Sequence, residues 1–278
     1  MSEADAVKRS LQPVTVQSLV ADLQTLGVRP GAVLLVHASL RALGWVCGAQ
    51  VAVIDALMQA LTPAGTLVMP THSAHFSDPA NWQHPPVPEA WWATIRASMP
   101  GFDPATTPTR GMGVIPEAFR AMPGVRRSYH PTASFAAWGQ RAAEITQFHA
   151  LRDPLGEESP LGRIYDLAGD ILLLGVGHDK NTSLHLAERR AFGETQSQTQ
   201  TGAPILGPQG WQWVTYAEPD VDSDDFEALG QAYGQVSQAL VVGKVGLATA
   251  LYMPQRELVE FGVAWLKAHR GPSGQVNA

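Results

Sequence analysis

The sequence predicts a single α/β domain, and three observations support that prediction. Short apolar runs bounded by turn residues, typical of buried strands, alternate with segments whose apolar residues recur at helical spacing. Strand–helix–strand units of this kind favour helices layered on a sheet. The 278 residues can form one large core, and no repeat or low-complexity linker divides them. We therefore expect one domain over residues 15–270, with an N-terminal tail at 1–14 and a C-terminal tail at 271–278.

The first elements in chain order are a frayed tail, a helix, a strand, a second helix and a second strand. Residues 15–26 place Leu19, Leu23 and Leu26 on one face, and Gly27 suits the end of a helix. Turns with proline and glycine then separate a strand at 32–36, a helix at 49–61 and a strand at 66–69. Residues 70–110 are rich in proline and tryptophan, which fits either a binding loop or a surface crossover anchored by its tryptophans.

The later elements follow from the same signals. Ser159 and Pro160 are typical of the first positions of a helix, which we expect to reach residue 167. We expect further helices at 113–122, 141–149, 226–240 and from Pro254 onward, and further strands at 133–138, 213–216 and 245–251.

The segment 171–190 is the most clearly organised part of the chain. Residues 171–174 are aliphatic and predict a buried strand, and glycines that permit a sharp turn follow it. The polar run 181–183 predicts the start of a helix that ends near Phe192. His185 lies in the first turn of that helix, at a strand–loop–helix junction where α/β proteins tend to place their chemistry. We interpret His185 as a general base, and an incidental histidine on a capped helix is the alternative.

Two further segments favour ligands of opposite charge. Residues 107–113 precede a helix, and their N–H groups, hydroxyls and Arg110 would suit a phosphate, although an ordinary helix start looks the same. They match neither a Walker A loop nor the dinucleotide fingerprint. Residues 218–227 hold six carboxylates and no Lys or Arg, which fits either a cation-binding segment or a solvated helix start. The net charge of −6 favours a cationic small molecule over nucleic acid as partner.

Several other classes of protein and site lack their signatures. No apolar run reaches the length of a membrane span, and the N-terminus has no hydrophobic signal region. We therefore expect no membrane partner and a cytoplasmic location. Cys47 is the only cysteine, which excludes an internal disulfide. We expect no metal because no ligand spacing typical of a metal site occurs, and the absence of a G-x-S-x-G motif disfavours a serine hydrolase.

Six blocks carry a resemblance to a known family, and they stand in this order: VHASLRALG (36–44), GTLVMPTHS (65–73), FDPATTPTRGMGVIPEAFR (102–120), RSYHPTASFAAWG (127–139), SPLGRIYDL (159–167) and GVGHDKNTSLHLAERRA (175–191). Together they resemble the aminoglycoside 3-N-acetyltransferase (antibiotic N-acetyltransferase) family over about residues 15–265. The resemblance implies an α/β fold with a central mixed β-sheet flanked by helices, distinct from the GCN5-related acetyltransferase fold. It also implies acetyl-CoA as the donor and a cationic aminoglycoside as the acceptor.

The resemblance also implies the site residues. His185 matches the family's catalytic histidine, and Glu218 and Asp220 inherit the catalytic carboxylates of a tyrosine–x–acid–x–acid segment. Asp78 is the counterpart of an acidic residue that follows a P-x-x-S segment. The expected acceptor-binding residues are Asp78, Asp179, Asn181, Glu188, Glu218 and Asp220. The expected CoA-binding residues are His37, Ala38, Ser39, Thr107, Thr109, Arg110, Gly111, Met112, Gly113 and Ser134.

The reaction that these residues imply is direct acetyl transfer, in a ternary complex, to the 3-amino group of the 2-deoxystreptamine ring. A histidine, whose ordinary pKa is about 6.5, suits the removal of a proton from an amine, and a helix N-terminus should keep it neutral at rest. Glu218 is the first candidate for orienting its other ring nitrogen, and Glu188 is the rival. The alternatives are a same-fold acetyltransferase for another amine, a CoA-thioester hydrolase and a non-catalytic CoA-binding protein. We expect a monomer or a homodimer.

Overall fold

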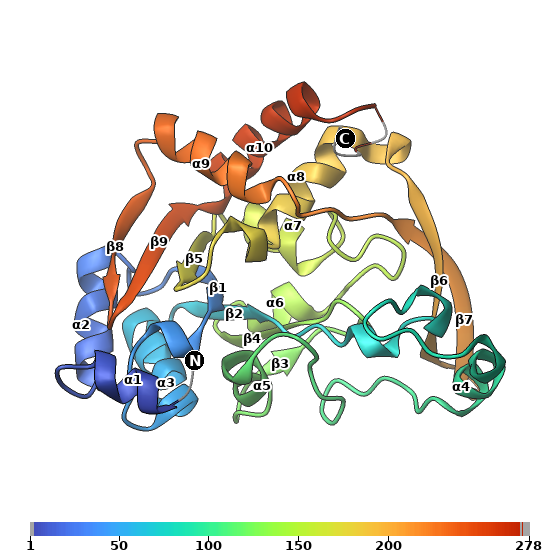
Figure 1. Cartoon of the computed structure of the whole chain (residues 1–278), viewed down its shortest axis with the longest axis horizontal. Helices are drawn as coiled ribbons and strands as arrows, with labels where there is room; N and C mark the ends of the chain where they lie inside the picture. The colour runs from blue at the N-terminus through green and yellow to red at the C-terminus, as the bar shows by residue number, and fades with distance from the viewer. Residues whose placement is uncertain (1–2, 273, 275–278) are drawn as a thin grey trace.

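A seven-stranded mixed sheet forms the centre of the molecule (Figure 1). The computed structural model describes residues 3–272 and 274. Three parallel strands form the middle of the sheet: β2 (Thr66–Pro70), β1 (Val33–Ala38) and β5 (Asp170–Leu174). Antiparallel strands extend it on both sides, with β4 (Phe135–Gly139) and β3 (Arg126–Arg127) beyond β2, and β9 (Ala248–Pro254) and β8 (Val241–Val245) beyond β5. The expected central mixed sheet is confirmed.

Helices cover both faces of this sheet, as expected. Side chains alternate along β1, so Leu34 and Val36 face one hydrophobic core while Leu35 faces the other. The first core is closed by α2 (Val16–Leu26), α3 (Ala49–Leu61) and α5 (Val114–Arg120). The second core is closed by α6 (Ala142–Thr146), α7 (Pro160–Asp166), α8 (Ser183–Phe192), α9 (Phe226–Val236) and α10 (Gln255–His269). Because helices pack on both faces of the sheet and bury its strands between them, the molecule has a three-layer α/β/α arrangement.

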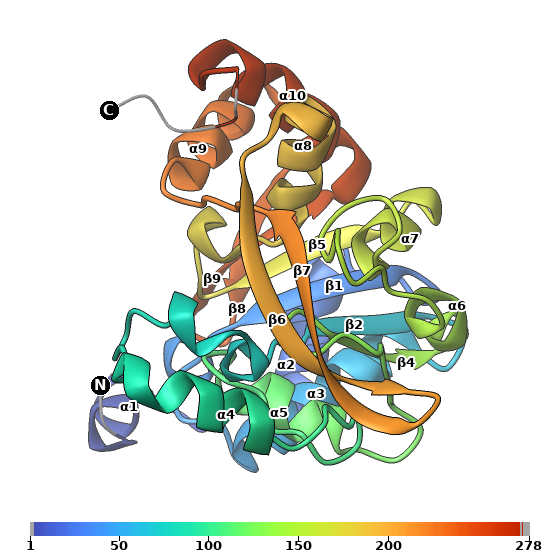
Figure 2. The ribbon, with the colours of Figure 1, turned by 90° about the vertical axis from the view of Figure 1, so that its right-hand side faces the viewer.

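A long two-stranded ribbon, separate from the main sheet, follows α8 and extends across one side of the molecule (Figure 2). It consists of β6 (Gln198–Gly207) and β7 (Gly210–Pro219), of which we expected only a strand at 213–216. The proline- and tryptophan-rich segment 70–110 packs against it and holds a short helix, α4 (Trp92–Ser98), that the sequence did not predict. The side-chain amide of Asn81 donates to the Gln200 carbonyl at 2.9 Å, and the Phe102 amide donates to the Pro204 carbonyl at 3.4 Å. The ribbon and this segment therefore form one connected wall.

Some expected boundaries differ from the structure. A strand expected at 245–251 is two strands, β8 and β9, because Gly246 takes a positive φ of 55° and turns the chain between them. The helices expected at 141–149 and 226–240 end earlier, at Thr146 and Val236.

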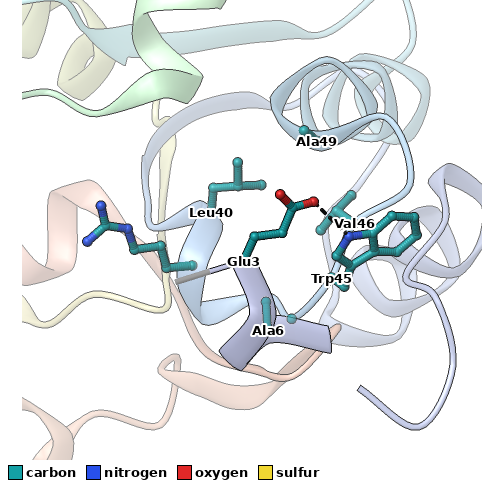
Figure 3. A pocket seen from close by; sticks show the side chains of 8 residues that line it. Glu3, Ala6, Leu40, Trp45, Val46 and Ala49 are labelled. Atoms are coloured by element: carbon teal, nitrogen blue, oxygen red, sulfur yellow. Dashed lines mark hydrogen bonds between the residues drawn. The ribbon is translucent and has the colours of Figure 1, made fainter. Parts of the chain in front are cut away.

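The expectation of a frayed N-terminal tail is corrected. Residues Glu3–Arg9 form a helix, α1, and Val14 pairs with Val46 in an isolated bridge. The Trp45 indole N–H donates to the Glu3 carboxylate at 3.2 Å, which ties α1 to the body of the molecule (Figure 3). Only residues 271, 272 and 274 of the expected C-terminal tail lie within the described part of the chain. No helix among the described residues is long and apolar enough to cross a bilayer.

Candidate active site

The candidate site lies where the three parallel strands end. The carboxyl ends of β1, β2 and β5 meet at one edge of the sheet, where open α/β sheets bind ligands. His37 lies near the end of β1, His72 follows β2, and His185 lies in the first turn of α8, which follows β5. Thr182 connects two of them, since its hydroxyl lies 3.3 Å from His37 Nε2 and its carbonyl accepts the His185 backbone N–H.

His185 has a fixed orientation. Its Nδ1 lies 2.9 Å from Oε2 of Glu188, which stands three residues further along α8 and therefore on the same helical face. A carboxylate can only accept a hydrogen bond, so Nδ1 carries the hydrogen, and in the neutral ring Nε2 then has the free lone pair. The ring packs on Phe226 with centroids 4.8 Å apart, yet 13% of the side chain stays exposed. This arrangement presents Nε2 as a proton acceptor.

The partner of His185 is Glu188, which corrects the expectation that Glu218 would be. The sequence left both carboxylates open because helical spacing favoured Glu188 while the family pattern favoured Glu218. Glu188 is 1% exposed and its second oxygen is also held, by the Arg270 guanidinium at 2.5 Å and by the Asp222 backbone N–H at 3.2 Å. Arg270 could not be predicted from the sequence, because it lies 82 positions from Glu188, directly after α10, and carries no local motif.

His37 and His72 line the same region as neutral rings. Burial lowers the pKa of His37 to about 3, and repulsion by His185 adds to the effect. Burial lowers the pKa of His72 to about 3 as well, with repulsion by His37 and His185 as the next causes. Nε2 of His72 is buried and has no hydrogen-bond partner within the described chain. His72 was not among the residues predicted from the sequence, although its place two residues after a buried strand was the available signal.

A cleft of about 380 Å³ brings together two segments that the sequence assigned to CoA binding. His37, Ala38 and Ser39 line one side of it, and Gly111, Met112 and Gly113 line another. Lys180 and Thr182 line the cleft as well, so it reaches the residue that precedes α8. Gly111 and Gly113 have φ values of 77° and 85°, a conformation that glycine adopts at little cost.

Other residues assigned to CoA do not line this cleft. Ser134 is fully buried, and its hydroxyl accepts from the Arg127 guanidinium and donates to the Thr71 carbonyl, so the expectation that it contacts CoA is corrected. Thr107 is 4% exposed, and its hydroxyl accepts the Asp103 N–H.

Thr109 and Arg110 lie at two other hollows of the surface. Thr109 lines a neighbouring one with Gly111 and Gly113, and Arg110 lines another with His75 and Trp82. A further cavity of about 490 Å³ lies between α1 and the loop that follows β1, and no acid or base of the candidate site lines it (Figure 3).

The carboxylates Glu218 and Asp220 lie at the end of β7, at the base of the ribbon. Burial and the neighbouring charge of Asp220 raise the pKa of Glu218 to about 7. Oε2 of Glu218 is buried and has no hydrogen-bond partner within the described chain. A carboxylate whose pKa is raised and whose oxygen has no hydrogen-bond partner is suited to bind a cationic ligand.

The other residues that we expected to bind the aminoglycoside have side chains that already bind other residues of this chain. Asp78 accepts from the Arg96 guanidinium at 2.7 Å and from the Ala80 N–H at 2.9 Å. Asp179 pairs with Lys180 at 3.0 Å but stays half exposed. Asn181 is 1% exposed and its side-chain oxygen accepts the Ser183 N–H at 3.2 Å, so it stabilises the start of α8 and the expectation of a substrate contact is corrected. No group of three or more His, Cys, Asp or Glu within residues 3–272 and 274 could hold a metal ion.

Comparison with known proteins shows which family and which relatives the chain is similar to. The family model described as aminoglycoside 3-N-acetyltransferase matches residues 35–267. The chain is 44% identical over 260 residues to the SPbeta prophage-derived aminoglycoside N(3')-acetyltransferase-like protein YokD of Bacillus subtilis, covering 93% of this chain and 94% of the relative. It is 38% identical to the aminoglycoside N(3)-acetyltransferase III of Pseudomonas aeruginosa, covering 94% and 96%.

Solved structures show the same fold. The crystal structure of YokD from Bacillus subtilis matches with a TM-score of 0.91 at 43% identity, covering 94% of this chain and 96% of that one. The structure of AAC-IIIb with CoASH matches with a TM-score of 0.83 at 30% identity, covering 94% and 98%. The structure of AAC-VIa bound to sisomicin matches with a TM-score of 0.83 at 32% identity, covering 92% and 98%.

Proposed function

Because the chain belongs to the aminoglycoside 3-N-acetyltransferase family, we propose that it transfers an acetyl group from acetyl-CoA to the 3-amino group of the 2-deoxystreptamine ring of aminoglycosides. The observation that carries the proposal is the 2.9 Å contact between His185 and Glu188 beside a cleft lined by His37 and Thr182. Thr182 links this pair to the cleft, because its carbonyl accepts the His185 backbone N–H and its hydroxyl lies 3.3 Å from His37 Nε2.

His185 is the general base of this reaction. An alkylammonium cannot attack a thioester until it loses a proton, and a positioned histidine typically contributes a factor of about 10²–10⁴ to the rate of such a transfer. Nε2 of His185 takes the proton, while Nδ1–H keeps its bond to Glu188. The Glu188 carboxylate then stabilises the imidazolium by its opposite charge. Both groups belong to α8, so their geometry is set before substrate binds.

The cleft beside His37 suits the pantetheine arm of CoA. Its walls include apolar side chains of Val36, Leu40 and Ile115, together with the backbone of Gly111–Gly113, whose lack of side chains permits a close approach. Arg41 and Lys180 add positive charge for the phosphates. When bound, acetyl-CoA would supply the thioester carbonyl that the amine attacks. The C–N bond forms, the C–S bond breaks, and CoA leaves as a thiolate that can take up the proton held by His185.

Glu218 and Asp220 form the acceptor side of the site. An aminoglycoside carries several ammonium groups, and an acidic segment attracts such a cation over a distance of about one Debye length. The ionised form of Glu218 gains an ion partner when the cation arrives, which offsets the burial that opposes its charge. The direct ternary-complex route fits the absence of a further activated nucleophile among the described residues that line the cleft.

A thiol-release assay tests this proposal. Purified protein with acetyl-CoA should release free CoA only when gentamicin, kanamycin, neomycin or apramycin is added. His185→Ala should reduce kcat by about 10² or more while CoA binding, measured by calorimetry, changes little. Release without any acceptor would identify a thioester hydrolase instead, and no release with any of the four would contradict the proposal.

A further inference from the structure

Arg270 joins three elements around the base. Arg270 directly follows the last residue of α10, and its side chain has no exposed area. Nη1 donates to Glu188 on α8 at 2.5 Å, while Nε and Nη2 donate to the two carboxylate oxygens of Asp225 at 2.8 and 2.5 Å. Nη2 also donates to the Asp222 carbonyl at 2.9 Å, so the same side chain holds the segment ahead of α9.

We infer that Arg270 is a positioning residue for the proposed reaction, acting through Glu188: it holds the Glu188 carboxylate in place, aimed at Nδ1 of His185. This inference rests on the proposed function for its kinetic consequences. Arg270 touches neither His185 nor the cleft, and it lies outside the residues 35–267 matched by the family model.

The energetic reason is the burial of Glu188. A carboxylate with 1% exposure that loses its cation either takes up a proton or draws one onto its histidine partner, because an unpaired buried charge is costly. In both cases the pair of His185 and Glu188 binds a proton at higher pH, and the base is then already occupied at neutral pH. The guanidinium prevents this by supplying the opposite charge on the other carboxylate oxygen.

The charge around His185 supports the same conclusion. The charged groups near it are Glu188 on its own helix, Arg270 beyond α10 and Asp225 ahead of α9. His37 and His72 face it from the ends of β1 and β2, and both are neutral because burial holds their pKa values at about 3. Two carboxylates and one guanidinium leave one net negative charge, which the imidazolium formed during the reaction neutralises. Glu188 therefore stabilises the imidazolium that forms when the proton arrives from substrate.

The shape of the guanidinium also matters. Its planar fork reaches Glu188 with one nitrogen and Asp225 with two others, an arrangement that a lysine ammonium cannot reproduce. The Phe226 ring lies beside both Arg270 and His185. Its centroid is 5.6 Å from the Arg270 guanidinium carbon and 4.8 Å from the centroid of the His185 ring. Fixing Arg270 therefore fixes the ring against which the base rests.

The test compares Arg270→Gln with a matched control, Arg189→Gln. Arg189 also pairs with a carboxylate from another segment, Asp153, at 2.8 Å; it follows Glu188 in the chain, but its guanidinium binds Asp153, Gly193 and Gln196 rather than the Glu188 carboxylate. In Arg270→Gln the acidic limb of the kcat/KM profile should move to higher pH by about one unit or more, since an opposite charge close to a carboxylate shifts its protonation by at least that much. Arg189→Gln should leave the limb in place even if its melting temperature falls.

A second readout is independent of the reaction. The His185 imidazole resonance, assigned by its loss in His185→Ala, should titrate at higher pH in substrate-free Arg270→Gln than in the wild type. This NMR shift decides the inference even if the wild type acetylates no aminoglycoside, a result that would contradict only the proposed function. An unchanged titration in folded Arg270→Gln, or an equal shift in Arg189→Gln, would overturn the inference.

Arg270→Lys replaces the glutamine variant if the latter does not fold. It should lower kcat by at least tenfold while the KM for acetyl-CoA stays within twofold of the wild type. In a Glu188→Gln background the same lysine substitution should cause no further loss, because Arg270 acts through Glu188. Losses that multiply in the double variant would show that Arg270 acts elsewhere and would overturn the inference.

Discussion

Glu188→Gln isolates the negative charge beside the base. Glutamine keeps the size of the side chain and one acceptor oxygen, so the 2.9 Å contact with His185 Nδ1 can persist while the charge is lost. Two unit charges about 4 Å apart interact by about 4 kcal/mol at an effective dielectric constant of 20. Each 1.36 kcal/mol corresponds to a tenfold change in rate, so removing this stabilisation from the imidazolium should lower kcat by about 10²–10³.

The assay is steady-state CoA release with saturating acetyl-CoA, and the matched control is Glu157→Gln. Glu157 also binds an arginine of α8, Arg190, at 2.5 Å, but its side chain is 59% exposed. An exposed ion pair contributes about 0–1 kcal/mol, so this control should keep kcat close to the wild-type value. A folded Glu188→Gln enzyme with kcat within about threefold of the wild type would show that the charge does not stabilise the transition state.

Three further predictions concern pH and salt. Since the pKa of Glu218 is raised to about 7, its carboxylate ionises as pH rises through that value, and the KM for a polycationic aminoglycoside should fall between pH 6 and 8; Glu218→Gln should flatten this dependence. Raising ionic strength from about 0.01 to 0.15 M shortens the Debye length from about 30 to 8 Å, so the KM for the aminoglycoside should rise more than the KM for acetyl-CoA; equal increases would argue against an acidic acceptor site. Finally, burial holds the pKa values of His37 and His72 at about 3, below the usual 6.5, so the unfolded chain binds more protons than the folded chain between these pH values. The free energy of unfolding, measured with urea, should therefore fall as pH drops below about 6.5, and it should fall less in His37→Gln.

The strands of the main sheet and the helices that cover it were largely predictable, because the local sequence pattern of each element matches its burial in the structure. The aliphatic run at 171–174 is buried on both faces, and Ser159 with Pro160 begins α7 as expected. The ribbon was predicted only in part. Its strands lack the two-residue alternation that is typical of a half-buried strand: β6 buries four consecutive residues, 201–204, whereas β7 buries only Tyr216 and Pro219.

The site was predictable where one element carries it. Helical spacing alone put Glu188 on the face of His185, and the strand–turn–helix pattern put His185 at the edge of the sheet. The family resemblance put His37–Ser39 and Gly111–Gly113 in one group, and the cleft brings these two segments together. It also included Ser134 and Asn181, whose side chains instead make internal hydrogen bonds.

The sequence by itself determined the alternation of strands and helices, the placement of His185 at a strand–helix junction and the presence of Glu188 about one helical turn further on. Each of these depends only on neighbours within a few residues. Only the tertiary structure decided which carboxylate holds the imidazole, and that Arg270 holds that carboxylate in turn. The physical reason is range: periodicity and capping act over one or two turns, whereas the burial and charge pairing of Glu188 depend on a residue from the other end of the domain, which only the packing of α10 on α8 brings into contact.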